Sequence, residues 1–136
     1  EEQRKKLLKI MSRTSEVMAR VELASDFLNI KKGELIHHNI HFEHIFVNNR
    51  KFSGIIDFNH VSVGDPLFEI AYFSVMPHGQ LYPILLKSSK VEMNQDKFRF
   101  YRLIISVGKI HTRYVKHNYL HEYPEILDTA LAELDR

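Results

Sequence analysis

Residues 35–47 read LIHHNIHFEHIFV and hold four of the nine histidines in this chain of 136 residues. The apolar end of this run and the run FSGII at residues 52–56 flank an Asn-rich turn, which predicts a β-hairpin. Asp57 closes its second strand. Residues 63–66, VGDP, predict the start of a helix, because Asp65 can cap free backbone N–H groups and Pro66 fits the first helical position.

The rest of the chain shows mainly helical patterns, with apolar residues recurring at three- and four-residue spacing. The predicted helices cover residues 3–28, 66–75, 94–114 and the segment after Pro124. We expect an extended approach at residues 34–37, a loop at residues 61–64, and a loop with a short helical piece up to Lys90. These elements predict a predominantly helical α+β fold. Because an isolated two-stranded hairpin is only marginally stable in water, we expect it to pack on the helices.

The composition indicates one ordinary globular domain spanning residues 1–136. Hydrophobic residues make up 44% of the chain and charged residues 26%, and a chain of this length can bury one core. No stretch approaches the roughly 20 apolar residues of a membrane-spanning helix. The charged N-terminal stretch lacks the apolar region of a signal peptide. We therefore expect no membrane association and a cytoplasmic location.

Charge and cysteine content narrow the function classes further. The 19 Lys and Arg residues against 17 Asp and Glu residues give a formal charge of +2, and the basic residues are scattered, which gives little support for nucleic-acid binding. The absence of cysteine excludes disulfides, thiolate metal sites and a cysteine nucleophile. It also agrees with a reducing compartment.

The ordered motifs resemble the aminoglycoside phosphotransferase and choline kinase-like superfamily. Its catalytic loop reads His-Gly-Asp, four residues, then Asn, followed by a hairpin, Ile-Asp-Phe-Gly, and later Gly-Asp-Pro at a helix start. The matching runs here are residues 37–44, 56–59 and 64–66. The resemblance covers residues 35–71 and implies the C-terminal lobe of a kinase-like fold. It also implies transfer of the γ-phosphate of ATP to a small-molecule hydroxyl, with Mg²⁺ and ATP as cofactors.

Five positions decide how much of that chemistry the resemblance implies for this chain. Asp57 corresponds to the metal-binding Asp, which can hold a cation that bridges nucleotide phosphates. His44 is at the position of the second metal ligand, usually Asn and in some related kinases His. Asn39 replaces the Asp that accepts or orients the acceptor proton, and losing a general base typically costs about 10²- to 10⁴-fold in rate. Asn59 and His60 replace a Gly and an acidic residue, so we expect weak activity or none.

The other motif positions imply support of the loop. His37 is the second candidate for a catalytic role, although the family residue at its position usually braces the loop. His41 matches a position where local packing is expected, and Asp65 is expected to cap the following helix and brace the loop. His38 replaces a Gly, and if that Gly takes a positive φ, His38 is strained.

The superfamily has a second, smaller lobe, which supplies a phosphate-covering loop and a Lys that grips the nucleotide. The sequence shows no Gly-rich loop and no Val-Ala-Ile-Lys-like strand, and it contains only five glycines. We therefore expect a C-terminal lobe without the N-terminal nucleotide-binding lobe. Apolar surface left exposed in this way would meet that lobe or a second copy of the chain.

Two other function classes stay open at this point. The first is a pseudoenzyme or interaction module, favoured by the loss of the Asp and of the motif glycines. The second is a metal-binding protein that uses His37, His41 and His44 with Asp57, because spacings of four and three residues would gather imidazoles on one helix face. The acceptor is also open: the segments expected to contact it hold several Lys and few acids, so charge gives no support for a cationic aminoglycoside.

Overall fold

The computed structural model describes residues 30, 32–77 and 79–117 and the isolated positions 5, 12, 15, 19, 22 and 132. The predicted helices over residues 3–28 and after Pro124 lie outside the described residues, apart from those isolated positions, which are helical. The chain divides into two compact units, one formed by Ile30–Arg102 and the other by Glu1–Asn29 with Leu103–Arg136. All the predicted site residues lie in the first unit. The single domain over residues 1–136 stays a prediction.

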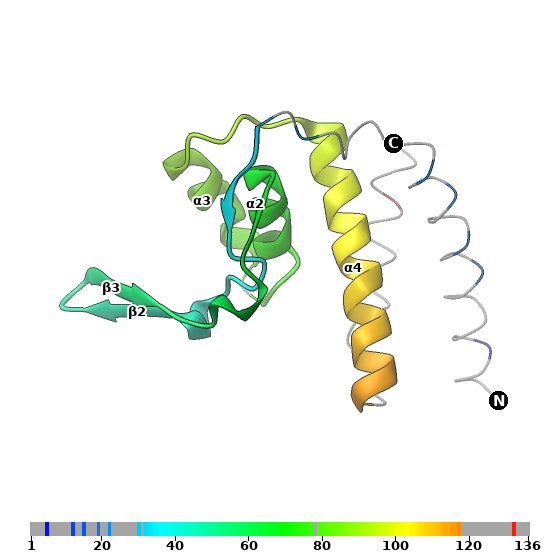
Figure 1. The fold of residues 1–136 in the computed structure, drawn as a ribbon, viewed down its shortest axis with the longest axis horizontal. Coiled ribbons are helices and arrows are strands. Elements are labelled where there is room, and N and C mark those ends of the chain that lie inside the picture. The colour runs from blue at the N-terminus through cyan, green and yellow to red at the C-terminus, as the bar shows by residue number, and fades with distance from the viewer. Residues whose placement is uncertain are drawn as a thin grey trace. The chain divides into compact units, whose positions relative to one another are not determined.

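The unit Ile30–Arg102 combines two small antiparallel sheets with short helices, which is a mixed α and β fold (Figure 1). In chain order the elements, with η denoting a 3₁₀ turn, are β1 (Glu34–Ile36), η2 (Phe42–His44), β2 (Ile45–Asn48), β3 (Lys51–Ile55), η3 (Phe58–His60), β4 (Ser62–Gly64), α2 (Pro66–Ser74), η4 (Gly79–Leu81), α3 (Tyr82–Ser88) and α4 (Gln95–His117). Helix α4 begins in this unit and continues into the other. None of the helices that the structure describes is both long and apolar enough to cross a membrane.

The first sheet pairs β1 with β4, so that Ile36 lies opposite Ser62 and Glu34 opposite Gly64. The prediction of a loop at residues 61–64 is therefore wrong, because most of this segment forms β4. A strand of three residues is too short to show an alternating pattern, and its partner is remote in the sequence. Strand β1 also packs on α2, so this sheet joins the start of the histidine-rich loop to the helix that follows the GDP motif.

The predicted hairpin is confirmed as β2 and β3, with Ile45 opposite Ile55 and Val47 opposite Phe52. A bulge between Phe46 and Val47 interrupts the register. The two turn residues, Asn49 and Arg50, both have positive φ values of 48° and 61°, as the two central residues of a type I′ turn require. The turn therefore follows the right-handed twist of the strands without a glycine.

The predicted packing of the hairpin on helices is not seen among α2, α3 and the start of α4, and it stays a prediction for the helices outside the described residues. Strands β2 and β3 extend away from α2 and α3 (Figure 1). Three apolar side chains near the turn are half or more exposed: Phe46 at 50%, Val47 at 64% and Phe52 at 70%. Within Ile30–Arg102 the sheet that lies on α2 is the β1 and β4 pair.

The predicted helices at residues 66–75 and 94–114 are confirmed as α2 and α4, and α3 is the short helical piece expected before Lys90. Helix α2 begins as the sequence indicates, since Asp65 Oδ1 accepts the Leu67 N–H at 2.9 Å. Helix α4 has a similar cap, in which Asn94 Oδ1 accepts the Lys97 N–H at 3.0 Å. The buried apolar residues of the unit are Ile36, Leu67, Ile70, Ala71, Phe73, Val75, Phe98, Phe100 and Tyr101.

Candidate functional site

His37 follows β1 and joins three elements. Its backbone N–H donates to the carboxylate of Glu69 in α2, and its ring Nε2 donates to the Ile56 carbonyl at 2.8 Å. Phe58 meets the ring edge-on at a centroid distance of 4.8 Å. The side chain is buried, and its Nδ1 has no hydrogen-bond partner among the residues that the structure describes. This geometry fits the predicted bracing role better than a catalytic one.

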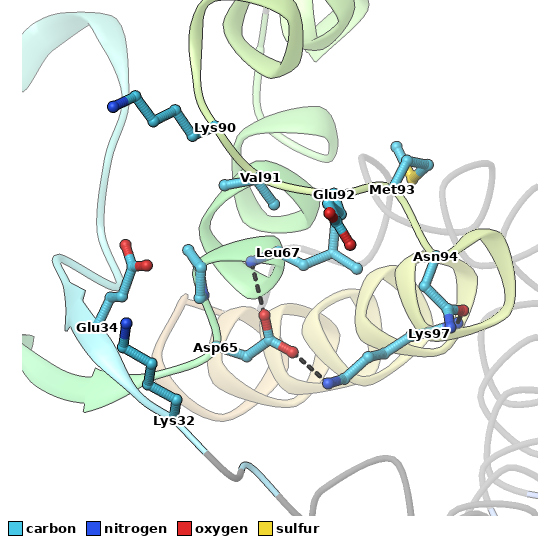
Figure 2. A pocket seen from close by; sticks show the side chains of 11 residues that line it. Lys32, Glu34, Asp65, Leu67, Lys90, Val91, Glu92, Met93, Asn94 and Lys97 are labelled. Atoms are coloured by element: carbon cyan, nitrogen blue, oxygen red, sulfur yellow. Dashed lines mark hydrogen bonds and ion pairs between the residues drawn. The ribbon is translucent and has the colours of Figure 1, made fainter.

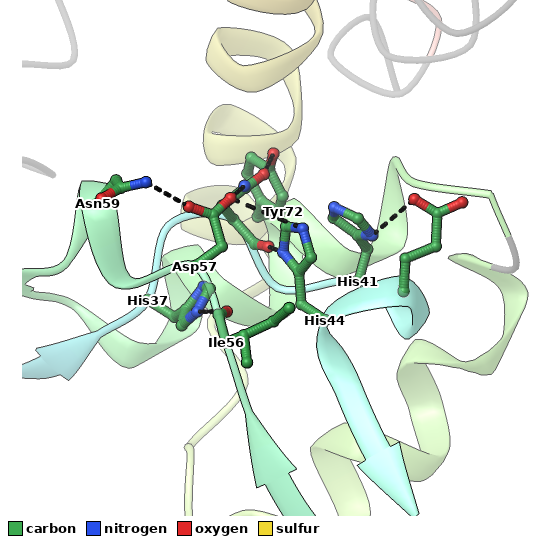
Figure 3. Close-up of polar contacts among 9 residues, drawn as sticks. His37, His41, His44, Ile56, Asp57, Asn59 and Tyr72 are labelled. Carbon is green, nitrogen blue, oxygen red and sulfur yellow. Dashed lines mark hydrogen bonds and ion pairs between the residues drawn. The ribbon is translucent and has the colours of Figure 1, made fainter.

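Asn39 and Asp57 are hydrogen-bonded to each other at the centre of the site. Figure 3 shows Asp57 there, with Asn59 on one side and His44 and Tyr72 on the other. The Asn39 amide Nδ2 donates to Asp57 Oδ2 at 2.6 Å, and Tyr72 in α2 donates its hydroxyl to Asn39 Oδ1 at 2.9 Å. Asn59 Nδ2 donates to the other carboxylate oxygen, Asp57 Oδ1, at 2.8 Å. Asp57 has a positive φ of 66°, which turns its side chain out of the strand direction just before η3. Both oxygens of the carboxylate therefore accept an amide N–H.

His44 is oriented by the loop and points toward the same carboxylate. Its Nδ1 donates to the Asn39 backbone carbonyl at 2.9 Å, and its Nε2 is 3.6 Å from Asp57 Oδ2. The His41 ring lies beside it at a centroid distance of 3.7 Å, and His41 Nδ1 is 3.8 Å from the Glu43 carboxylate. His41 thus packs locally, as its position suggests, while His44 joins the polar cluster.

The electrostatics of the cluster favour an ionised Asp57. Burial raises the pKa of this carboxyl, but the Asn39 hydrogen bond, the nearby His44, the Asn59 hydrogen bond and His60 together outweigh it and hold the pKa below its ordinary value. Hydrogen bonds to the charged form explain most of the lowering. Asp57 is therefore a carboxylate at neutral pH that can only accept hydrogen bonds.

The groups around Asp57 do not fit a Mg²⁺ ion in this arrangement. Mg²⁺ prefers oxygen ligands in near-octahedral geometry, whereas the groups that approach the carboxylate here are the nitrogens of Asn39, Asn59 and His44. A metal role for Asp57 and His44 stays a prediction, and it requires the two amides to turn away.

The histidine-cluster hypothesis is wrong for the described residues. His37, His41 and His44 do not share a helix face, because the segment that contains them is a loop followed by the single turn η2. His37 is bound to Ile56 rather than directed at the other two rings. Within residues 32–77 and 79–117, no group of three or more His, Cys, Asp or Glu side chains could hold a metal ion.

Asp65 binds three partners at the start of α2. One oxygen caps the helix, and the other accepts the Tyr101 hydroxyl at 3.0 Å and pairs with the Lys97 ammonium group. Burial raises the pKa of Asp65, but Lys97, the Leu67 N–H and Tyr101 outweigh it and hold the pKa below its ordinary value. Burial and the Asp65 charge raise the pKa of Tyr101. The predicted cap is confirmed, and Asp65 also fastens α2 to α4.

Comparison with known proteins gives one family match, to the model described as the phosphotransferase enzyme family, over residues 4–86. The matched region covers more than half of the chain and contains every predicted site residue. The chain belongs to the phosphotransferase enzyme family. A comparison with curated protein sequences gives no match.

A solved member of the phosphotransferases shares the fold. It is the apo crystal structure of a thermostable mutant of the aminoglycoside phosphotransferase APH(4)-Ia, with a TM-score of 0.69 and 16% sequence identity. The similarity covers 93% of this chain and 43% of that protein, so this chain spans less than half of the length of its structural relative. At this level of identity the likeness shows the fold alone.

His38 departs from the phosphotransferase motif in the way that its sequence suggests. It has a positive φ of 61°, a conformation that costs a residue with a side chain on the order of 1 kcal/mol. Its Nε2 is 2.6 Å from the Ser62 hydroxyl in β4, and its ring lies 5.0 Å from Phe68. These contacts connect the loop of residues 37–44, called the phosphotransferase loop below, to β4 and α2.

Two site residues were not predicted from the sequence, Glu69 and Tyr72, and both lie on α2. They are three positions apart, so they share one helix face, and that face is directed at the phosphotransferase loop. The sequence holds part of the signal for them. Asp65 and Pro66 define where the helix begins, and the starting residue determines that Glu69 and Tyr72 lie on the same helix face. What the sequence lacks is any indication that α2 lies beside the loop.

A cavity of about 520 Å³ lies in the same unit, and neither Asn39 nor Asp57 lines it. Figure 2 shows the residues that do. The cavity is open and polar, and it lies where Asp65 and Lys97 meet, between β1 and the segment before α4. Its other charged lining residues are Lys32, Glu34, Lys90 and Glu92. Cations and anions balance there, so the cavity shows no preference for a charged ligand.

Proposed function

We propose that this chain is the C-terminal lobe of a small-molecule phosphotransferase whose transfer of the ATP γ-phosphate to a hydroxyl is weak or lost. Membership of the phosphotransferase enzyme family supports the reaction class. The position of Asn39 beside Asp57 supports the same assignment of the loop. Mg²⁺ and ATP are the cofactors that the reaction class needs, and a cytoplasmic location, where ATP is abundant, belongs to the same proposal.

The proposed weak or lost activity rests on one observation, which is how the Asn39 side chain is hydrogen-bonded. In the related enzymes a carboxylate at this position accepts or orients the acceptor proton. Here Nδ2 is a donor bound to Asp57, and Oδ1 already accepts from Tyr72 and has negligible basicity. Neither atom can take a proton from a substrate hydroxyl. The described residues around Asp57 therefore hydrogen-bond to one another and leave no group that would orient a substrate hydroxyl.

Turnover of ATP by the Asn39→Asp variant tests this proposal. With Mg·ATP in excess, we expect the variant to hydrolyse or transfer phosphate about 10²- to 10⁴-fold faster than the unchanged protein, because a general base is restored. Asn49→Asp makes the same chemical change at the exposed hairpin turn and is expected to leave the rate unchanged. Equal rates for all three proteins, with no ATP binding by calorimetry, would contradict the phosphotransferase proposal.

A second candidate function, an interaction module without catalysis, is favoured by the exposed apolar hairpin. Val47 and Phe52 form a cross-strand pair near its tip, and a second exposed pair, Leu35 and Val63 at 73% and 72%, lies on the β1 and β4 sheet. Exposed apolar patches of this kind commonly mark interaction surfaces. The partner in this reading is the N-terminal lobe of the family or a second copy of the chain.

Self-association tests that reading. Replacing Val47 and Phe52 together with threonine keeps the strand preference but removes apolar surface. We expect the dissociation constant of any dimer to rise about tenfold or more, equivalent to about 1.4 kcal/mol, in sedimentation velocity measurements. Lys51→Thr changes the same hairpin without removing apolar surface and serves as the control. A protein that is monomeric at all concentrations before substitution would exclude the second copy as the partner.

A further inference from the structure

The Asp57 carboxylate is surrounded by N–H donors, as a bound anion would be, and not by the oxygen ligands of a metal site. Each of its oxygens accepts one amide N–H, at 2.6 Å from Asn39 and 2.8 Å from Asn59. Two directed donors satisfy a carboxylate in a part-buried position much as a bound cation would. Both donors are at motif positions where the resemblance implies a different residue, Asp at 39 and Gly at 59.

The orientation of the Asn39 amide follows from its two partners. The amide nitrogen donates to Asp57 Oδ2, so the amide oxygen must face the opposite way. At that side the Tyr72 hydroxyl, from α2, donates to the oxygen at 2.9 Å. The Asn39 backbone carbonyl is bound as well, by His44 Nδ1 at 2.9 Å. Asn39 is therefore fixed at its main chain and at both ends of its side chain.

We propose that Asn39, turned toward Asp57 by Tyr72, takes the place of a divalent cation, so that the loop keeps its folded form without one. Tyr72 is a positioning residue in this arrangement, because it acts through Asn39. The proposal rests on the proposed function for the identity of the loop, but it does not require any turnover. It goes beyond the loss of a base: the same substitution that removes the base also supplies the loop with a substitute for the metal.

The Asn39→Asp variant reverses this situation. It brings a carboxylate oxygen to the position that now holds the amide nitrogen, 2.6 Å from Asp57 Oδ2. Two ionised carboxylates at such a distance repel each other strongly unless a proton or a cation lies between them. The variant should therefore depend on a divalent cation for stability, whereas the unchanged protein should not.

Thermal unfolding measures this dependence without any activity assay. In EDTA we expect Asn39→Asp to unfold roughly 5–10 °C below the unchanged protein, because a hydrogen bond to a charged group is replaced by repulsion. Addition of about 10 mM Mg²⁺ or Mn²⁺ should recover most of this loss through binding to the folded state. The unchanged protein and the control Asn49→Asp should each shift by no more than about 1 °C on the same addition.

The role of Tyr72 has its own readout. In the unchanged protein the side-chain amide protons of Asn39 should exchange slowly with water in NMR spectra. Tyr72→Phe should accelerate that exchange about tenfold or more, while Tyr82→Phe, which removes a hydroxyl from α3, should leave it unchanged. A merely structural role of Tyr72 would change the melting temperature without selectively changing the Asn39 amide.

Two results would overturn the inference: stabilisation of the unchanged protein by Mg²⁺ by several degrees, or an Asn39→Asp variant whose unfolding is indifferent to divalent cations. The outcome is separable from that of the proposed function. Cation-dependent unfolding of the variant with neither turnover nor ATP binding would remove the phosphotransferase proposal and leave this one. Turnover by the variant without cation-dependent unfolding would do the reverse.

Discussion

Asp65→Ala is expected to lower the free energy of unfolding by about 3 kcal/mol. The substitution removes a helix cap, which contributes about 1 kcal/mol, and charge-assisted hydrogen bonds, which contribute about 1.5–3 kcal/mol each. These contributions do not add fully. Asp65 accepts the Leu67 N–H at the start of α2 and the Tyr101 hydroxyl on α4, and neither donor has another acceptor among the described residues. Asp65 also pairs with Lys97. Its side chain is only 13% exposed, so water cannot replace these partners fully. Urea unfolding monitored by circular dichroism measures the difference.

Matched variants separate the contributions. Asp65→Asn removes the charge and keeps a single acceptor oxygen, which can serve the cap or the Tyr101 hydroxyl but not both, so its loss of stability should be intermediate. Lys97→Ala removes the ion pair and the contact of the ammonium group with the Tyr101 ring, 5.7 Å from its centroid, but it leaves the cap and the Tyr101 hydrogen bond in place, so its effect should be the smallest of the three. If Asp65→Ala costs no more than Lys97→Ala, the cap and the Tyr101 bond contribute little and the prediction is wrong.

The contribution of Asp65 should also depend on pH. The pKa of this carboxyl is lowered in the folded protein, so the folded state favours the ionised form. Its stabilisation is therefore fully present above the unfolded-state pKa of about 3.9 and is lost as the pH falls through the lower folded-state value. The difference in stability between the unchanged protein and Asp65→Ala should be constant near pH 6 and shrink below about pH 4. A difference that grows on acidification would contradict this assignment.

Gly79→Ala is expected to lower the free energy of unfolding by about 2–3 kcal/mol, as overpacking at a tightly closed site does. A Cβ atom built on Gly79 lies 2.1 Å from the Ser74 carbonyl oxygen, 2.6 Å from the Ser74 carbonyl carbon and 3.2 Å from the Phe73 carbonyl oxygen. All three are backbone atoms at the end of α2, so no side-chain rotation can relieve the overlap. The chain after α2 must move to accept the methyl group.

Gly54→Ala is the matched control for that substitution. A Cβ atom on Gly54, in β3, has nothing within 4 Å, and no described glycine has a positive φ. We expect this variant to unfold within about 0.5 kcal/mol of the unchanged protein. Comparable losses for the two variants in urea unfolding would show that alanine disturbs the protein through backbone preference rather than through the contact with α2.

Elements with strong local signals could be predicted from the sequence. The Asp65-Pro66 pair defined the start of α2, and the three- and four-residue spacing of apolar residues defined α4. The pairing of β1 with β4 could not be predicted, because three-residue strands have almost no pattern and their partners are remote. The packing of the hairpin was predicted from the usual instability of isolated hairpins, whereas its apolar tip is exposed in the unit described.

In the candidate site, too, some features could be predicted from the sequence and others could not. The motif spacing was enough to bring Asn39, His44 and Asp57 together, and the structure has all three in contact. The direction of the Asn39 amide could not be predicted, because it is decided by Tyr72, a residue on a helix whose place beside the loop depends on the tertiary fold. The role of Asn59 as a donor to Asp57 also follows from the turn at Asp57, which the local sequence does not reveal.

The two amides on Asp57 also determine in which solutions a change at position 39 is tolerated. In the Asn39→Asp protein, Asn59 still donates to one oxygen of Asp57 while a second carboxylate faces the other oxygen. The two carboxylates repel each other until a cation lies between them, so the substitution is harmful where divalent cations are scarce. The divalent cation content of the surroundings, rather than the fold itself, would then decide whether a loop with a carboxylate at position 39 stays folded.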